Sequence, residues 1–240
     1  MNKAISLIIL TVLLLGFYLF YIHGRAYWHP LYVNVAGART VSDVANQYGQ
    51  EARQRMKPYF EQAGVQYPPK SVALLAMKDE AKLELWDTSG KKPNFIREYP
   101  IKALSGVSGP KLREGDRQVP EGLYDIVYLN PNSSYHLSMK LNYPNSFDKK
   151  HAKAEGRTQP GTNIFIHGKA VSIGCLAMGD EAAEELFILA TDTGYGNIKV
   201  AIAPSDPRKE ALKPIDGLAW TKELYSKLTN YYLRFIKSKD

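Results

Sequence analysis

Apolar and polar residues follow two different periods along the chain, and the change of period separates a helical N-terminal part from a strand-rich remainder. Residues 41–64 carry apolar side chains every three to four positions, which predicts an amphipathic helix with one buried stripe. Ser42 is the candidate N-cap of this helix, Gly64 is its stop signal, and Pro68 with Pro69 marks a boundary. The stripe comprises Val41, Val44, Ala45, Tyr48, Ala52, Met56 and Phe60.

Beyond residue 70 the apolar runs become short, and Gly, Pro, Asn or Ser residues bound each of them. Such runs predict β-strands. Residues 71–77 and 81–86 predict a β-hairpin, and further strands are expected at 95–101, 122–129, 137–141, 163–167 and 197–203. Helices are expected at 180–191, with Asp180 as N-cap, and at 218–237, with one apolar face. The pattern predicts a β-rich α+β fold with flanking helices.

The N-terminus contains an uncharged apolar run over residues 5–22. As a helix this run reaches about 27 Å, which is close to the hydrocarbon thickness of a bilayer. Lys3 precedes it, and an aromatic band marks its outer end: Phe17, Tyr18, Phe20, Tyr21, Tyr27 and Trp28. We expect one transmembrane helix that acts as an uncleaved signal anchor, with the remaining chain exported. A cleaved signal peptide is the alternative.

Composition and charge exclude several kinds of partner and site. The chain has 240 residues, with 31 Lys and Arg against 24 Asp and Glu, so its formal net charge is +7. These charges are scattered and no nucleic-acid-binding module is recognisable, so we expect no nucleic-acid partner. A single cysteine, Cys175, excludes an intrachain disulfide and a Cys-rich zinc site. The five histidines lack carboxylate-rich spacing, so we expect no metal and no cofactor.

The candidate chemistry lies between residues 164 and 178. His167 follows an apolar strand, and Cys175 follows a Ser172-x-Gly174 turn eight positions later. A thiol attacks as the thiolate, so a nucleophilic cysteine needs a neighbouring base or a positive field. Gly174 permits backbone conformations closed to other residues, and amides beside it could bind an oxyanion. From the residues alone, Cys175 is either a buried core thiol or a nucleophile.

This segment resembles the signature of the YkuD-type L,D-transpeptidases, and its compact spacing is most similar to the YafK-like branch. The matching residues are His167, Gly168, Ser172, Gly174 and Cys175, with Met178 at the following apolar position. The blocks 109–124 and 143–151, the hairpin at 71–87 and the C-terminal helix with Trp220 also match, so the resemblance covers roughly residues 71–236.

The resemblance implies a catalytic fold of two packed mixed sheets and a cysteine mechanism without a cofactor. Cys175 would attack an L-to-D peptide bond of a peptidoglycan stem, forming a thioester, and His167 would shuttle the proton. Amides around Gly174 and Cys175 would bind the oxyanion, and Ser172 would steady the loop or the histidine. An amine acceptor gives transpeptidation, whereas water gives hydrolysis.

Substrate recognition is expected from Gly168, Lys169, Tyr143 and Lys111. Many relatives carry Arg two residues after the cysteine, where this chain has Ala177. Replacements for that missing cation are expected among Lys169, Lys111 and Arg113; His136 and His151 are alternative acid/base groups, and Tyr135 is an alternative groove residue.

We therefore expect a signal anchor over residues 1–24, a helical linker over 25–70, a catalytic domain over 71–204 and a helical extension over 205–240 packed on it. The anchor implies inner-membrane attachment with the catalytic domain in the periplasm, or a periplasmic protein after cleavage. The expected function is L,D-transpeptidation in cell-wall synthesis, remodelling or cell shape, with stem peptides as partners. The alternatives are an L,D-hydrolase that cleaves stems or releases a wall-attached protein, a cysteine peptidase with another substrate, and a non-catalytic wall-binding module.

Overall fold

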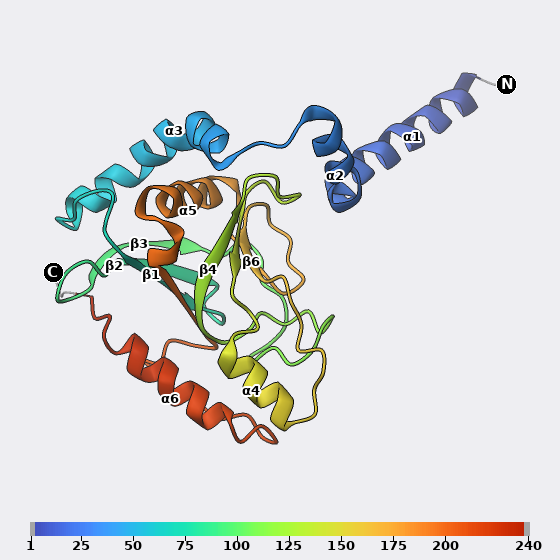
Figure 1. Ribbon diagram of the computed structural model, residues 1–240. Helices are drawn as coiled ribbons and strands as arrows, with labels where there is room; N and C mark the ends of the chain where they lie inside the picture. The colour runs from blue at the N-terminus through green and yellow to red at the C-terminus, as the bar shows by residue number, and fades with distance from the viewer. Residues whose placement is uncertain (1–2, 238–240) are drawn as a thin grey trace.

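The computed structural model describes residues 3–237 and begins with three helices, α1 (Lys3–His23), α2 (Arg25–Ala36) and α3 (Val41–Gln62). Helix α1 projects away from the body of the molecule, and α2 folds back beside its inner end (Figure 1). Within the described residues, one helix is long and apolar enough to cross a membrane, and its window Ile5–Ile22 has a mean hydropathy of 2.6. That window has no buried residue, so α1 contributes nothing to the core.

The strands form one curled mixed sheet in the order β3-β2-β1-β8-β4-β5-β6-β7. Their bounds are β1 (Val72–Met77), β2 (Lys82–Asp87), β3 (Asn94–Pro100), β4 (Gly122–Asn130), β5 (Ser138–Leu141), β6 (Phe165–His167), β7 (Leu176–Ala177) and β8 (Ile198–Ala203). The pairs β1–β8 and β6–β7 are parallel and the other pairs are antiparallel. Strand β4 pairs with β8 through its first half and with β5 through its second half, beyond a register shift. The two expected sheets are therefore continuous through β4, and the α+β expectation is confirmed.

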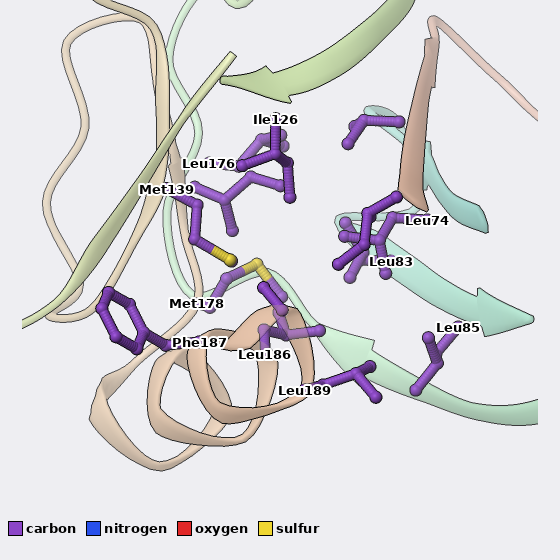
Figure 2. Packing of buried hydrophobic residues seen from close by; sticks show 14 of the residues in the cluster. Leu74, Leu83, Leu85, Ile126, Met139, Leu176, Met178, Leu186, Phe187 and Leu189 are labelled. Carbon is purple, nitrogen blue, oxygen red and sulfur yellow. The ribbon is translucent and has the colours of Figure 1, made fainter. Parts of the chain in front are cut away.

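Two hydrophobic clusters pack on opposite faces of the sheet. On one face, α3 and α5 (Asp180–Thr193) cover side chains such as Leu74, Leu83 and Leu85. Figure 2 shows Leu186 and Leu189 of α5 on the side of these residues and Phe187 on the other side, toward Met139. On the other face, α6 (Thr221–Tyr232) covers Leu75 and its neighbours. Because β1 side chains alternate between the faces, this strand contributes to both clusters. Helix α4 (Ser146–Ala154) lies beside α6 (Figure 1).

Helix α3 is capped two residues earlier than its sequence signals indicate. Thr40, not Ser42, is the N-cap: its side chain accepts from the Asp43 N–H, and the Asp43 carboxylate accepts from the Thr40 N–H. Further along α3, the Arg53 guanidinium donates two 2.7 Å hydrogen bonds to Asp192 of α5. The helix is therefore attached to the body through both its apolar stripe and a bidentate ion pair.

Several short elements were not anticipated from the sequence. They are α2, α4, the two-residue strand β7 and the 3₁₀ turn η1 (Tyr195–Asn197). Helix α4 overlaps the family-like block at 143–151, and Asn145 starts it with a capping box to Asp148. The strand expected at 163–167 is confined to β6 because Asn163 has a φ of 56°, a left-handed conformation incompatible with a strand.

Candidate active site

Strands β6 and β7 bring the histidine and the cysteine of the motif to one wall. Ile166 pairs with Leu176 and His167 pairs with Ala177, so Cys175 lies beside Phe165 in the neighbouring strand. Side chains alternate along each strand, and Ile166 and Leu176 point into the core with 0% exposure. Phe165, His167 and Cys175 instead line a common cavity.

The cavity has a volume of about 1150 Å³, which is large enough for a peptide substrate. Its wall is assembled from five parts of the chain. These are the junction of α1 and α2, the loop before β4, the segment from β4 to β5, the residues around β6, and the loop before β7. The lining side chains include Tyr21, Ile22, Arg25, Lys111, Arg117, Asn163, Lys169 and Cys175.

His167 is buried and held in one tautomer. Its Nδ1 lies 2.6 Å from the Gly168 carbonyl oxygen, which can only accept, so Nδ1 carries the proton and Nε2 keeps its lone pair. The Tyr135 ring packs against the imidazole, with centroids 4.9 Å apart. Burial lowers the pKa of His167, and the hydrogen bond to Gly168 only partly opposes this. The imidazole is therefore neutral near pH 7 and can accept a proton at Nε2.

Cys175 is half-buried, and its environment favours the neutral thiol. Burial raises the pKa of Cys175; a hydrogen bond from the Phe165 backbone and the positive charge of Lys111 oppose the rise. The sulfur lies 3.9 Å from the Asn163 carbonyl oxygen, toward which the thiol is directed. Because the pKa of the cysteine rises while that of His167 falls, the resting pair is thiol and imidazole, not thiolate and imidazolium.

Ser172 binds the backbone of the cysteine loop. Its Oγ donates to the Cys175 carbonyl oxygen at 2.7 Å and accepts from the N–H groups of Cys175 and Gly174, at 3.1 and 3.3 Å. This geometry supports the loop-steadying role, and it gives the two amides expected to bind an oxyanion an acceptor in Ser172 Oγ. A developing oxyanion would have to compete with Ser172 Oγ for the same two donors. Gly174 has a φ of 126°, which explains the need for glycine there.

The two lysines expected to bind substrate line the cavity, but each is paired. Lys111 Nζ donates to the Asp116 carboxylate and to the Arg113 carbonyl oxygen at 2.9 Å. Lys169 Nζ lies 2.5 Å from the Asp180 carboxylate, whose other oxygen accepts the Lys169 N–H. The charge of each ammonium group is thus largely balanced by its own carboxylate partner.

Tyr143 and Gly168 do not line the cavity. Tyr143 is 4% exposed, and its hydroxyl donates to the carbonyl oxygens of Pro160 and Lys111, so it supports the Lys111 loop from within. The carbonyl oxygen of Gly168 accepts the hydrogen bond from His167 Nδ1. A Cβ at Gly168 would come within 2.9 Å of the Tyr135 carbonyl oxygen, so a side chain there has no room.

The remaining candidates lie outside the cavity. His136 Nε2 is 2.9 Å from Glu184, and His151 stacks on Trp220 beside α6. Ala177 is fully buried in β7, where its backbone bonds to Ala103, so a longer side chain at this position would require its neighbours to move. Arg113 is exposed and is not part of the cavity wall.

Arg117 and Asn163 are cavity residues that the sequence did not indicate. Together with Lys169 they are three of the five non-glycine residues with positive φ in the described part of the chain, at 54°, 56° and 59°. Strained backbone of this kind concentrates at functional sites. Composition offers no signal for it, because Arg and Lys are ordinary loop residues. Within residues 3–237, no group of three or more His, Cys, Asp or Glu side chains could hold a metal ion.

Comparison with known proteins gives one consistent match. Residues 76–202, more than half of the chain, match the family model for the YkuD L,D-transpeptidase catalytic domain. YafK of Escherichia coli strain K12, provisionally named an L,D-transpeptidase, is 33% identical over 138 residues. That alignment covers 55% of this chain and 54% of YafK, so the chain spans about half the length of this relative.

Two solved structures share part of the architecture. The helical cell shape determining protein Pgp2 of Campylobacter jejuni aligns with a TM-score of 0.46 and 18% identity over 70% of this chain and 71% of its own. Bd1075 of Bdellovibrio bacteriovorus aligns with a TM-score of 0.42 and 20% identity over 68% and 60%. The match to the catalytic-domain model covers both β6 and the cysteine loop. The chain therefore belongs to the YkuD family of L,D-transpeptidase catalytic domains.

Proposed function

We propose that the protein is a cysteine-dependent L,D-transpeptidase that acts on peptidoglycan stem peptides through a thioester. The observation that carries this proposal is that a protonated thiol, Cys175, and a neutral imidazole, His167, line the same cavity from neighbouring chain segments, and that the tautomer of His167 leaves Nε2 free to accept. Nucleophilic acyl transfer needs a general base within reach of a thiol.

The first half-reaction transfers the stem acyl group to the cysteine. His167 Nε2 takes the thiol proton as the sulfur of Cys175 bonds to the carbonyl carbon, giving a tetrahedral oxyanion. When this intermediate collapses, the C–N bond breaks, and the imidazolium returns its proton to the leaving amine. The products are a thioester on Cys175 and a free amine. His167 starts and finishes this exchange as the neutral imidazole. Cys175 starts as the neutral thiol and finishes as the uncharged thioester, so burial favours both end states.

The second half-reaction resolves the thioester. His167 removes a proton from the incoming amine, and the new amide bond forms. The thiolate of Cys175 then leaves and takes the proton back from the His167 imidazolium. Water in place of the amine gives hydrolysis by the same steps. Ala177 stands where many relatives place a cation for substrate binding, so this position offers no charge to a substrate carboxylate in either reaction. Hydrolysis would cleave stems or release a wall-attached protein.

We also propose that α1 is a signal anchor that holds the catalytic domain on the periplasmic side of the inner membrane. Its exposed apolar surface and the aromatic residues Tyr27 and Trp28 of α2 suit a bilayer core and its interface. Residues 25–70 would then connect the anchor to a catalytic domain over 71–204, and residues 205–240 would cover that domain from the α6 side.

Incubation of isolated sacculi with the wild-type protein and with Cys175→Ala, followed by mass spectrometry of the released material, tests the function. New L,D crosslinks that require Cys175 establish transfer, whereas shortened stems or freed protein-linked peptides establish hydrolysis. Cleavage of ordinary L-peptides without any action on sacculi would identify a peptidase with another substrate. Binding of sacculi with no Cys175-dependent product would leave a wall-binding module and overturn the catalytic proposal.

A further inference from the structure

The cavity wall carries four cationic side chains, and they differ in how far they are neutralised. Lys111 pairs with Asp116, and Lys169 pairs with Asp180. Hydrogen bonds from the Lys169 side chain and backbone outweigh the opposing effect of burial and lower the pKa of Asp180, so that carboxylate is ionised and balances its lysine. These two lysines therefore offer little net charge to a ligand.

The two arginines are different. Arg25 Nε donates to the Ser134 carbonyl oxygen at 2.6 Å, and its guanidinium lies over the Trp28 ring. Arg117 has no hydrogen-bond or ion-pair partner for its side chain anywhere in residues 3–237, although it lines the cavity. A guanidinium that faces a concave site and has no protein partner keeps all five donors available for a ligand.

The backbone of Arg117 is held in a defined conformation. Its φ of 54° lies in the left-handed region, which costs a non-glycine residue free energy and persists only where the surroundings hold it. Asp116, immediately before it, accepts backbone N–H bonds from Leu112, Arg113 and Gln118, so the carboxylate ties both arms of the turn together. Arg117 follows Asp116 directly in this turn and lines the cavity.

The same turn is coupled to the cysteine loop. The Gln118 carbonyl oxygen lies 3.4 Å from the position that a Cβ on Gly174 would occupy, so the two backbones are in close contact. Behind the turn, the buried Lys78 ammonium bonds to the carbonyl oxygens of Gly109 and Val119 and to the Glu121 carboxylate. The position of the Arg117 backbone relative to Cys175 is thus set by packed neighbouring backbone, and not by a flexible loop.

We propose that Arg117 binds a carboxylate of the stem peptide and thereby fixes which substrates reach Cys175. This inference rests on the proposed function for the identity of the ligand. The planar guanidinium can hold a carboxylate through two parallel hydrogen bonds, and a neutral amide cannot reproduce that pairing. The site would accordingly distinguish a stem with a free carboxylate from the same stem with that group amidated.

The test measures binding with the full chain carrying Cys175→Ala, so that no turnover occurs. The ligands are a purified stem tetrapeptide and forms of it in which one carboxylate at a time is amidated. We expect amidation of one particular carboxylate to weaken binding about tenfold when Arg117 is present and to have no further effect in Arg117→Gln. Arg117→Lys should keep part of the discrimination, because it keeps the charge but not the bidentate geometry.

Arg113→Gln is the matched control, because this substitution removes the same unit of charge from the same loop. Arg113 is exposed and lies outside the cavity wall. This variant should bind every ligand as the parent does. Equal weakening of all ligands by Arg117→Gln, equal effects of the two variants, or no measurable binding of the free acid would each overturn the proposal. Sacculus turnover by the protein with Cys175 intact reports separately on the function, so Arg117-dependent binding without a Cys175-dependent product would refute the function alone.

Discussion

Cys175 and His167 reach their resting protonation states through one cause, the removal of both side chains from water. Burial penalises the thiolate and the imidazolium alike, so it raises the pKa of the cysteine and lowers the pKa of the histidine. The nucleophile is then generated when a substrate occupies the cavity and the proton moves to Nε2. This differs from cysteine enzymes in which a charged pair exists before the substrate arrives.

The neutral pair predicts a particular pH dependence. Because Cys175 is the only cysteine, its alkylation by iodoacetamide can be followed directly, and we expect the rate to keep rising with pH up to pH 9 without levelling off. Turnover needs an unprotonated His167, so its acid limb should lie below pH 6.5, the ordinary histidine value. His167→Gln should abolish turnover and leave the alkylation profile nearly unchanged. An alkylation rate that levels off below pH 7 would instead indicate a preformed thiolate.

At the scale of elements, α6 is connected to the catalytic face through one buried carboxylate. Tyr225 of α6 donates to Glu121 at 2.8 Å, and the other oxygen of Glu121 accepts from Lys78 and from the Gly109 N–H. These bonds join the C-terminal helix to both ends of the loop that presents Arg117. A residue far along the sequence therefore supports the shape of the cavity.

Tyr225→Phe tests this connection. Removal of the hydroxyl leaves one oxygen of the buried Glu121 without that donor, and we expect the free energy of unfolding in urea to fall by about 1–2 kcal/mol. Tyr231→Phe is the control, since it lies on the same helix and its hydroxyl has no hydrogen-bond partner in the chain from 3 to 237. If both variants lose equal stability, the hydroxyl of Tyr225 has no special role.

The longest and most regular elements were predictable because their patterns extend over many residues. The α3 stripe, the hairpin of β1 and β2, and α5 each repeat one period several times. Strand β7 has only two residues, which cannot display a period, and it forms because β6 pairs with it. The capping box of Asn145 and Asp148 was a readable signal for α4, whereas nothing in the sequence marks Arg117 as different from Arg113.

The motif placed His167 and Cys175 correctly on one cavity wall, but it could not supply the hydrogen bonds around them. Whether the amides of Gly174 and Cys175 face a substrate or Ser172 depends on the fold of the loop, which no residue type determines. Tyr143 fails as a cavity residue for the same reason. Its identity is compatible with a groove, and only packing turns it inward.

At the scale of the whole molecule, the first 37 residues are separable from the core. Neither hydrophobic cluster includes a residue before Val41, and α2 is held to the body chiefly through Arg25 and the Ser134 carbonyl oxygen. A chain that starts at residue 38 should therefore fold and keep its thermal midpoint within about 2 °C. It should no longer co-sediment with phospholipid vesicles, whereas the full chain should. A large loss of thermal stability would show that α1 and α2 are structural.

Tyr21 and Ile22 belong both to α1 and to the wall of the cavity. With α1 inserted in a bilayer as we propose, the contact of Tyr21 and Ile22 with the cavity would keep the reactive sulfur at a limited height above the lipid. Wall material beyond that height is out of reach however tightly it would bind. In the cell, the gap between membrane and wall would then limit turnover, and a change in that gap would regulate the enzyme without any ligand.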